Sequence, residues 1–150
     1  MTAPIKPSQG AAFARIMAVG GYRPSRVVTN AEICEQIDST DEWIRERSGI
    51  IERRFAAADE TVADMATAAA TKAVERSGID PAQIGMVMIA SVTHPYPTPS
   101  AAAQVANRLG AVNAAATDLS SACAGFCYAL ALADTIVRTG TSEHVLVIGA

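Results

Sequence analysis

The chain of 150 residues has the length of one globular domain and can bury a core without metal or disulfide staples. Half of its residues are apolar and 18% are charged, which argues against a disordered chain. A net charge of −3 argues against nucleic-acid binding, because such proteins need clustered positive charge. Three cysteines without paired spacing predict neither a disulfide framework nor a zinc site, and free thiols favour a cytoplasmic protein. No apolar run approaches the ~18 residues that a membrane span requires, so we expect no membrane partner.

The first residues predict a lead-in and a strand. Residues 1–12 contain two prolines and a glycine but no apolar core, so we expect a flexible lead-in and no secretory signal. The run ARIMAVG at 14–20 predicts a strand, since it is apolar and ends at a Gly-Gly pair. One domain is expected to follow over residues 13–150.

Two short helices are expected next. Asn30 is a suitable N-cap for the first, which would carry Ile37 on its apolar face. Ser39 and Glu42 have the spacing of a capping box and predict the start of a second helix. Gly49 is well placed to end that helix.

From residue 61 onward, helical patterns alternate with apolar runs of strand length. Continuous apolar runs suit strands that are buried on both faces, as in a parallel sheet. The alternation predicts an α/β protein with a layered, mixed and largely parallel sheet that is covered by helices. We expect helices over 61–77, 99–109 and 123–138, and strands over 86–92, 114–119 and 144–149.

The segment TDLSSACAGFCY at 117–128 is the strongest candidate for chemistry. It predicts a strand, a turn of small residues and a helix, with Cys123 in the first helical turn. Backbone N–H groups at a helix amino terminus favour a thiolate and can stabilise an oxyanion. The alternative is that Cys123 is a small buried hydrophobic residue. Cys127, one turn further along the same helix, is expected to lie in the core, and Cys34 is expected to be structural.

Three separated segments occur in an order that resembles the β-ketoacyl-acyl carrier protein synthase III family of condensing enzymes. DLSSACAGF at 118–126 resembles the active-site segment, in which the cysteine between two alanines is acylated. GGYRPSRVVTN at 20–30 and DSTDEWIRERSGIIERR at 38–54 resemble its early motifs. The resemblance implies a thiolase-like fold and assigns the catalytic role to Cys123.

The resemblance also implies a protein about twice as long, built from two similar halves. Residues 13–150 would be the amino-terminal half, ending before its last strand and before the second half. The catalytic histidine and asparagine of the family would lie in that second half, since neither His94 nor His144 matches the catalytic position. We therefore expect the 150 residues alone to lack condensing activity.

By the same resemblance, four further residues would bind the substrate. Trp43 would stack on the adenine of coenzyme A, Arg47 would contact its phosphates, and Ser39 would lie close by. The alternative for Trp43 and Arg47 is a core anchor beside a solvated charge. Thr98 would reach and shape the acyl pocket of the neighbouring subunit. It could also cap the following helix, with Pro99 as the first residue of that helix.

The implied reaction starts fatty-acid synthesis. Acyl-coenzyme A would acylate the cysteine, and malonyl-acyl carrier protein would then condense with decarboxylation to give 3-oxoacyl-acyl carrier protein. The implied enzyme is a homodimer that needs coenzyme A only as part of the substrate and no bound metal. One alternative is a polyketide-priming synthase or an acyltransferase of the same fold, and another is a truncated, non-catalytic interaction module. Four arginines could serve the nucleotide, the carrier protein or neither: Arg45, Arg47, Arg53 and Arg54.

Overall fold

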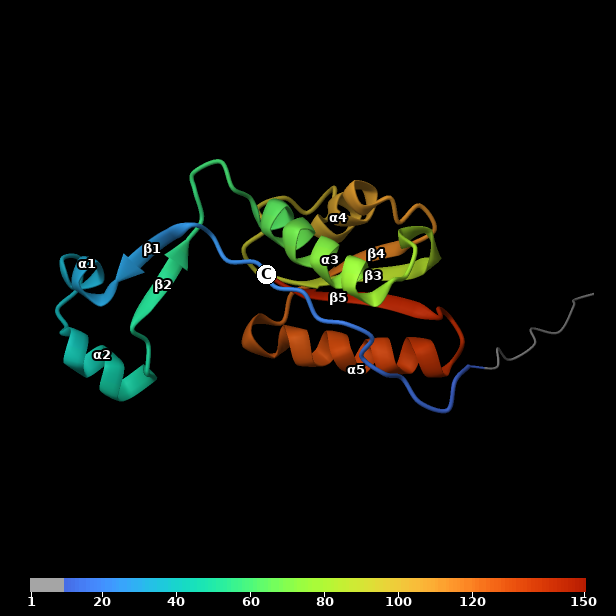
Figure 1. The fold of residues 1–150 in the computed structure, drawn as a ribbon, viewed down its shortest axis with the longest axis horizontal. Coiled ribbons are helices and arrows are strands. Elements are labelled where there is room, and N and C mark those ends of the chain that lie inside the picture. Colours follow the sequence, from blue (N-terminus) through green and yellow to red (C-terminus); the bar gives the residue numbers. More distant parts are fainter. Residues whose placement is uncertain (1–9) are drawn as a thin grey trace, which may run out of the picture. The chain divides into compact units, whose positions relative to one another are not determined.

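A computed structural model describes residues 10–150, which form two compact units (Figure 1). The smaller unit spans residues 23–61, and the larger one contains the residues before 23 and those from 62 onward. Most of the predicted lead-in, residues 1–9, lies outside the described part of the chain.

The larger unit is built on a parallel sheet of three strands in the order β4-β3-β5. Helices α3 and α4 pack on each other and on one face of the sheet, and α5 packs on the opposite face (Figure 1). This arrangement gives three layers and confirms the predicted α/β class. The strands are β3 (Ile84–Ala90), β4 (Ala115–Leu119) and β5 (His144–Gly149), and the helices are α3 (Val62–Ser77), α4 (Ala101–Leu109) and α5 (Gly125–Arg138), with short 3₁₀ turns at Pro81–Gln83 and Ala122–Ala124.

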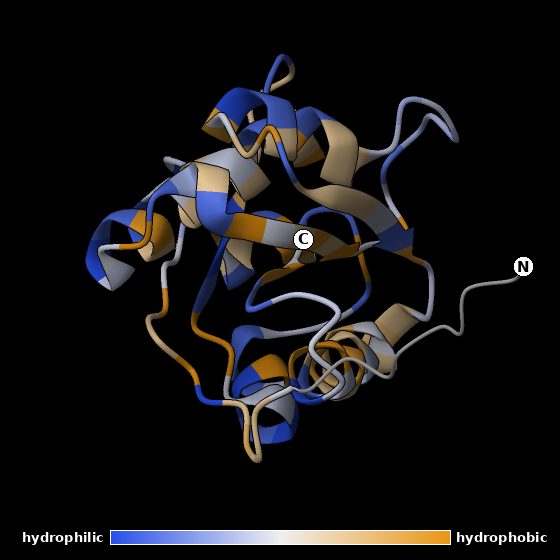
Figure 2. Cartoon of the chain, turned by 90° about the vertical axis from the view of Figure 1, so that its right-hand side faces the viewer, coloured by the Kyte–Doolittle hydropathy of each residue, from blue (hydrophilic) through white to orange (hydrophobic). Residues whose placement is uncertain are grey.

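The core of this unit lies between β3 and the two helices above it. Val87, on the central strand, is fully buried and pairs in register with Ala116 and Leu146. The helices meet the sheet through small side chains, so their backbones approach closely. Figure 2 shows the hydrophobic colouring along the strands and mixed colouring on the helices. The buried helical residues in this cluster are Ala66, Ala70, Ala101, Ala102, Val105 and Ala106.

The smaller unit has little apolar core. Its strands β1 (Arg26–Thr29) and β2 (Glu52–Phe55) form an antiparallel pair, joined through helices α1 (Asn30–Cys34) and α2 (Asp41–Ser48). Val28 and Ile44 are its buried apolar side chains among the described residues, and Asn30 is buried with them. The sequence pattern predicts neither strand, because each is only four residues long and β2 carries three charged residues.

The strand predicted over 14–20 is wrong. This segment joins no sheet in the described residues and instead lies against α3. The Arg76 guanidinium donates a hydrogen bond to the Val19 carbonyl at 2.7 Å. At Gly20 an added Cβ would lie 2.2 Å from the Ala69 carbonyl oxygen, so the backbone touches the helix directly. An apolar run forms a strand only where another strand lies beside it to pair with.

Three predicted helix caps are displaced by one or two residues. In each case, an extended hydroxyl residue nearby accepts the hydrogen bond from the backbone N–H three residues later. Helix α1 also ends at Cys34, so Ile37 lies beyond it and is exposed. The observed caps are Thr29 in place of Asn30, Thr40 in place of Ser39, and Ser100 in place of Thr98.

Candidate active site

Cys123 lies in the turn that joins β4 to α5, and its side chain is exposed. The predicted order of strand, small-residue turn and helix is confirmed. The α-helix begins at Gly125, two residues later than expected, because a 3₁₀ turn comes first. Ala122 has a φ of 43°, in the left-handed region that non-glycine residues seldom adopt. This strained residue turns the chain sharply next to the cysteine.

The turn is held close to the end of β3. The Ser91 N–H donates a hydrogen bond to the Leu119 carbonyl at 3.2 Å, which joins the two strand ends. At Gly125 an added Cβ would lie 3.1 Å from the Ala90 Cβ. Cys123 therefore sits at the carboxyl ends of parallel strands, the edge at which open α/β sheets bind ligands.

Asp118 connects this edge to helix α4. Its two carboxylate oxygens accept hydrogen bonds from the backbone N–H groups of Ala101 and Ala102, each at 2.8 Å. A carboxylate at a helix amino terminus satisfies N–H groups that have no partner within the helix and complements the helix dipole. Sequence reasoning missed this role. An acidic residue near a strand end does not indicate a capping role by itself, because only the tertiary fold shows which helix lies next to it.

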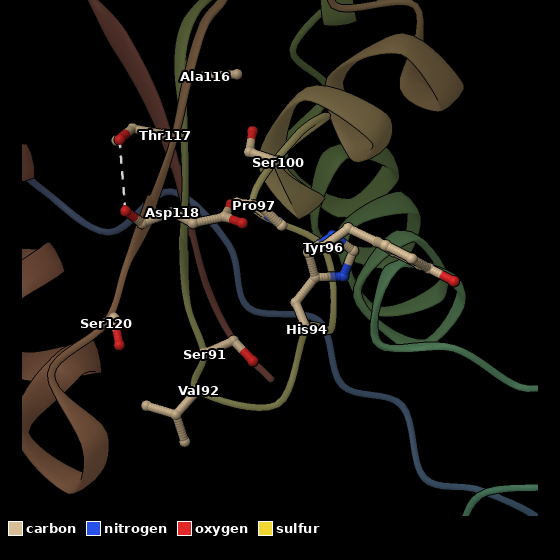
Figure 3. A pocket seen from close by; sticks show the side chains of 10 residues that line it. All are labelled: Ser91, Val92, His94, Tyr96, Pro97, Ser100, Ala116, Thr117, Asp118 and Ser120. Carbon is tan, nitrogen blue, oxygen red and sulfur yellow. Dashed lines mark hydrogen bonds between the residues drawn. The ribbon is translucent and has the colours of Figure 1, made fainter.

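A hollow of about 380 Å³ opens beside Asp118, at the ends of β3 and β4 (Figure 3). His94 and Tyr96 meet edge to face there, with ring centroids 5.9 Å apart. The His94 Nδ1 atom is buried and has no hydrogen-bond partner in the part of the chain that the structure describes. Other lining residues include Pro97, Ser100 and Ser120.

The two predicted site residues of the larger unit lie outside that lining. Cys123 follows Ser120 by three residues but does not line the hollow, and the exposed Thr98 does not line it either. Thr98 belongs to the loop between β3 and α4, where Pro97 on one side of it does contribute to the wall. The structure thus places Cys123 and Thr98 in the same unit, on two segments that flank the same end of the sheet.

Trp43 and Arg47 lie on α2, in the smaller unit. The Trp43 side chain is 57% exposed, so the alternative in which it anchors the core is wrong. The Arg47 guanidinium lies 6.0 Å from the centre of the Trp43 ring, within the range of a cation–π contact. The buried residue of this helix is Ile44. The pair therefore presents an aromatic face and a positive charge together.

Ser39 precedes α2, with Thr40 between them. Its hydroxyl oxygen is buried and has no hydrogen-bond partner among residues 10–150. The capping role predicted for it falls to Thr40, whose hydroxyl accepts the Trp43 N–H at 3.2 Å.

The other cysteines and the acidic residues of the described part of the chain are the remaining candidate metal ligands. Within residues 10–150, no group of three or more histidine, cysteine, aspartate or glutamate side chains is arranged to hold a metal ion. Cys34 is partly buried, whereas Cys127 is exposed, so the core position expected for Cys127 is wrong. Among the described helices, none has the length and apolar character needed to cross a membrane.

Comparison with known proteins connects this geometry to one family. The sequence pattern of 3-oxoacyl-[acyl-carrier-protein] synthase III matches residues 117–150, which include Cys123. A β-ketoacyl-[acyl-carrier-protein] synthase III of Streptomyces coelicolor is 54% identical over 97% of the chain, and one of Streptomyces glaucescens is 53% identical over the same share. The chain spans 42% and 44% of these two relatives, about two fifths of their length.

Solved structures give the same result for the fold. The priming β-ketosynthase of a polyketide biosynthetic pathway superposes with a TM-score of 0.92 at 45% identity, over 98% of this chain and 44% of that one. A 3-oxoacyl-[acyl-carrier-protein] synthase III of Aquifex aeolicus superposes with a TM-score of 0.86 at 41% identity, over 90% of this chain and 44% of that one. The fold is thiolase-like, and the chain is similar over nearly its whole length to β-ketoacyl-acyl carrier protein synthase III enzymes, of which it spans about two fifths.

Proposed function

We propose that Cys123 is the acylated nucleophile of a condensing enzyme that starts fatty-acid synthesis. The observation that carries the proposal is the exposed thiol at a sharp turn between β4 and α5. Alanines flank it on both sides, so an acyl thioester can approach the sulfur without meeting a bulky neighbour. The turn leads into the amino terminus of a helix of 14 residues, whose dipole favours negative charge.

The first half reaction transfers an acyl group to the cysteine. The Cys123 thiolate attacks the thioester carbonyl of acyl-coenzyme A and forms a carbon–sulfur bond. The tetrahedral oxyanion then collapses, and the bond to the coenzyme A sulfur breaks, so coenzyme A leaves as a thiolate. The backbone N–H of Cys123 is the proposed donor to that oxyanion, since a donor is most useful where charge develops.

The second half reaction forms a carbon–carbon bond. Malonyl-acyl carrier protein loses carbon dioxide, and the resulting carbanion attacks the acyl carbon on Cys123. The Cys123 sulfur leaves as a thiolate, and the product is 3-oxoacyl-acyl carrier protein. The histidine and asparagine that the resemblance assigns to decarboxylation match no position among these 150 residues.

Substrate binding is assigned to α2 and to the β3–α4 loop. Trp43 would stack on the adenine of coenzyme A and Arg47 would contact its phosphates; their mutual contact supports this assignment. Ser39, with its unpartnered hydroxyl, would lie near the same ligand. Thr98 would shape the acyl pocket of the neighbouring subunit in a cytoplasmic homodimer.

Intact-mass spectrometry of the native protein, before and after addition of a short acyl-coenzyme A, tests the nucleophile. We expect a single acyl adduct that Cys123→Ser abolishes and Cys127→Ser leaves in place, because only the first thiol lies at the turn. An adduct that survives in Cys123→Ser would overturn the assignment. The same spectrum measures the native mass, for which the resemblance predicts about twice the mass of 150 residues.

A polyketide-priming synthase is the second candidate, and the superposition on a priming β-ketosynthase favours it. Both enzymes would use the same acyl-cysteine, so the adduct does not separate them. The discriminating measurement is kcat/KM for a panel of straight, branched and unusual acyl-coenzyme A primers with malonyl-acyl carrier protein. A preference for the short primers of fatty-acid synthesis supports the fatty-acid enzyme. Activity with unusual primers and with no others supports the polyketide-priming synthase.

A further inference from the structure

Asn30 forms hydrogen bonds through both polar atoms of its side chain, inside the smaller unit. It is 1% exposed. Its Nδ2 group donates to the Asp41 carboxylate at 2.6 Å and to the Ile50 carbonyl at 2.8 Å. Its Oδ1 atom accepts from the Arg53 guanidinium at 2.6 Å. One buried amide thereby joins the start of α1, the start of α2, the segment after α2 and strand β2 (Glu52–Phe55).

Asp41 extends this network along α2. It is the first residue of the helix and also pairs with Arg45, one turn later, at 2.8 Å. The hydrogen bonds from Arg45 and then from Asn30 lower the pKa of Asp41 from its ordinary value of 3.8. Asp41 is therefore ionised at neutral pH and holds both partners as a charged acceptor.

Apolar packing supplies little else to orient α2. Ile44 is the buried residue of this helix. A helix with one buried apolar side chain is held only weakly about its own axis, whereas directed hydrogen bonds at its first turn fix its orientation. Trp43 and Arg47 lie on this same helix, so the direction in which they point depends on the bonds that Asn30 makes.

We infer that Asn30 is a positioning residue for the nucleotide-binding face of α2. It does not touch the substrate; it fixes the first turn of the helix that carries Trp43 and Arg47. The inference rests on the proposed function, in which those two side chains bind the nucleotide of coenzyme A.

The test uses two thioesters that carry the same short acyl group. Acyl-coenzyme A contains the nucleotide, whereas acyl-pantetheine ends before it. In the native protein, Asn30→Asp keeps the size of the side chain and an acceptor for Arg53, but places a second carboxylate against Asp41. We expect KM for acyl-coenzyme A to rise about tenfold with kcat unchanged, and kcat/KM for acyl-pantetheine to stay at the wild-type value.

Two further variants, Trp43→Ala and Arg47→Ala, separate this inference from the proposed function. Both variants should raise KM for acyl-coenzyme A and leave kcat/KM for acyl-pantetheine unchanged. If they affect both thioesters alike, the nucleotide contact itself is wrong. The positioning role is wrong if Trp43→Ala and Arg47→Ala affect only acyl-coenzyme A but Asn30→Asp does not. A variant Asn30→Asp that slows the reaction of both thioesters equally would be such a result.

Asp41→Asn keeps the inference testable if Asn30→Asp does not fold. Asp41 is on the surface, and its amide replacement keeps an acceptor for Asn30 while losing the ion pair with Arg45. We expect a smaller rise of about threefold in KM for acyl-coenzyme A, again with no change for acyl-pantetheine. An unchanged KM in Asp41→Asn, with Asn30→Asp unfolded, would count against the inference.

Discussion

At the residue scale, Gly125 sets how closely the cysteine turn approaches β3. In Gly125→Ala the new methyl group would stand 3.1 Å from the Ala90 Cβ and 3.7 Å from the Leu119 carbonyl oxygen. Overpacking of this kind costs about 1–3 kcal/mol, and the gain in helix propensity offsets up to about 1 kcal/mol of it. We expect a net loss of about 1 kcal/mol in the free energy of unfolding, with slower acylation of Cys123 because its turn is displaced.

The matched control for this change is Gly21→Ala. No heavy atom lies within 4 Å of a Cβ built on Gly21, and its backbone is not left-handed. Both the free energy of unfolding and the acylation rate should therefore stay at their wild-type values. Equal effects of the two substitutions, measured by denaturant unfolding and by the time course of adduct formation, would contradict the packing argument.

At the element scale, Asp118 ties strand β4 to helix α4. Asp118→Ala removes both acceptors of the Ala101 and Ala102 N–H groups, so we expect a loss of about 1–3 kcal/mol in the free energy of unfolding. Ser100→Ala is the matched comparison at the same helix end. It removes one neutral hydrogen bond, to the Ala103 N–H, and should cost about 1 kcal/mol. If denaturant unfolding finds the smaller loss in Asp118→Ala, the carboxylate is not the main cap of α4.

The sequence predicts elements well where one signal decides them. The apolar run at 144–149 coincides with β5, and Gly78 lies just after the end of α3 with a φ of 69°. Strands β1 and β2 carry no such run, so their pairing with each other cannot be read from an apolar pattern. The segment at 14–20 shows the converse error, since an apolar pattern does not show whether a neighbouring strand is present.

For the candidate site, the sequence nominates candidate residues but does not predict the contacts that hold them. Cys123 stands out because small residues surround it and a helix follows, and the structure keeps both features. The roles of Asn30 and Asp118 depend on contacts with residues far away in the chain, such as Arg53 and Ala101. No local pattern encodes those contacts, so they follow only from the three-dimensional arrangement.

At the scale of the whole molecule, large apolar side chains on the larger unit face solvent. Two stretches hold many of them, residues 13–19 and the first turns of α5, where Phe126 and Leu132 are each 45% exposed. Exposed apolar surface of this kind promotes association. We expect a polypeptide of these 150 residues, prepared alone, to form larger species as its concentration rises. Size-exclusion chromatography with light scattering measures this association.

The control for this association is a double substitution on α5, Phe126→Ser with Leu132→Ser. It removes two exposed apolar side chains from one helix and should shift the polypeptide toward the monomer, because exposed serines lose little by facing water. A monodisperse monomer of the unaltered polypeptide at every concentration would mean that the exposed stretches do not drive association. That result would favour a self-sufficient, non-catalytic interaction module over one part of a condensing enzyme, since the latter needs further protein surface to cover α5.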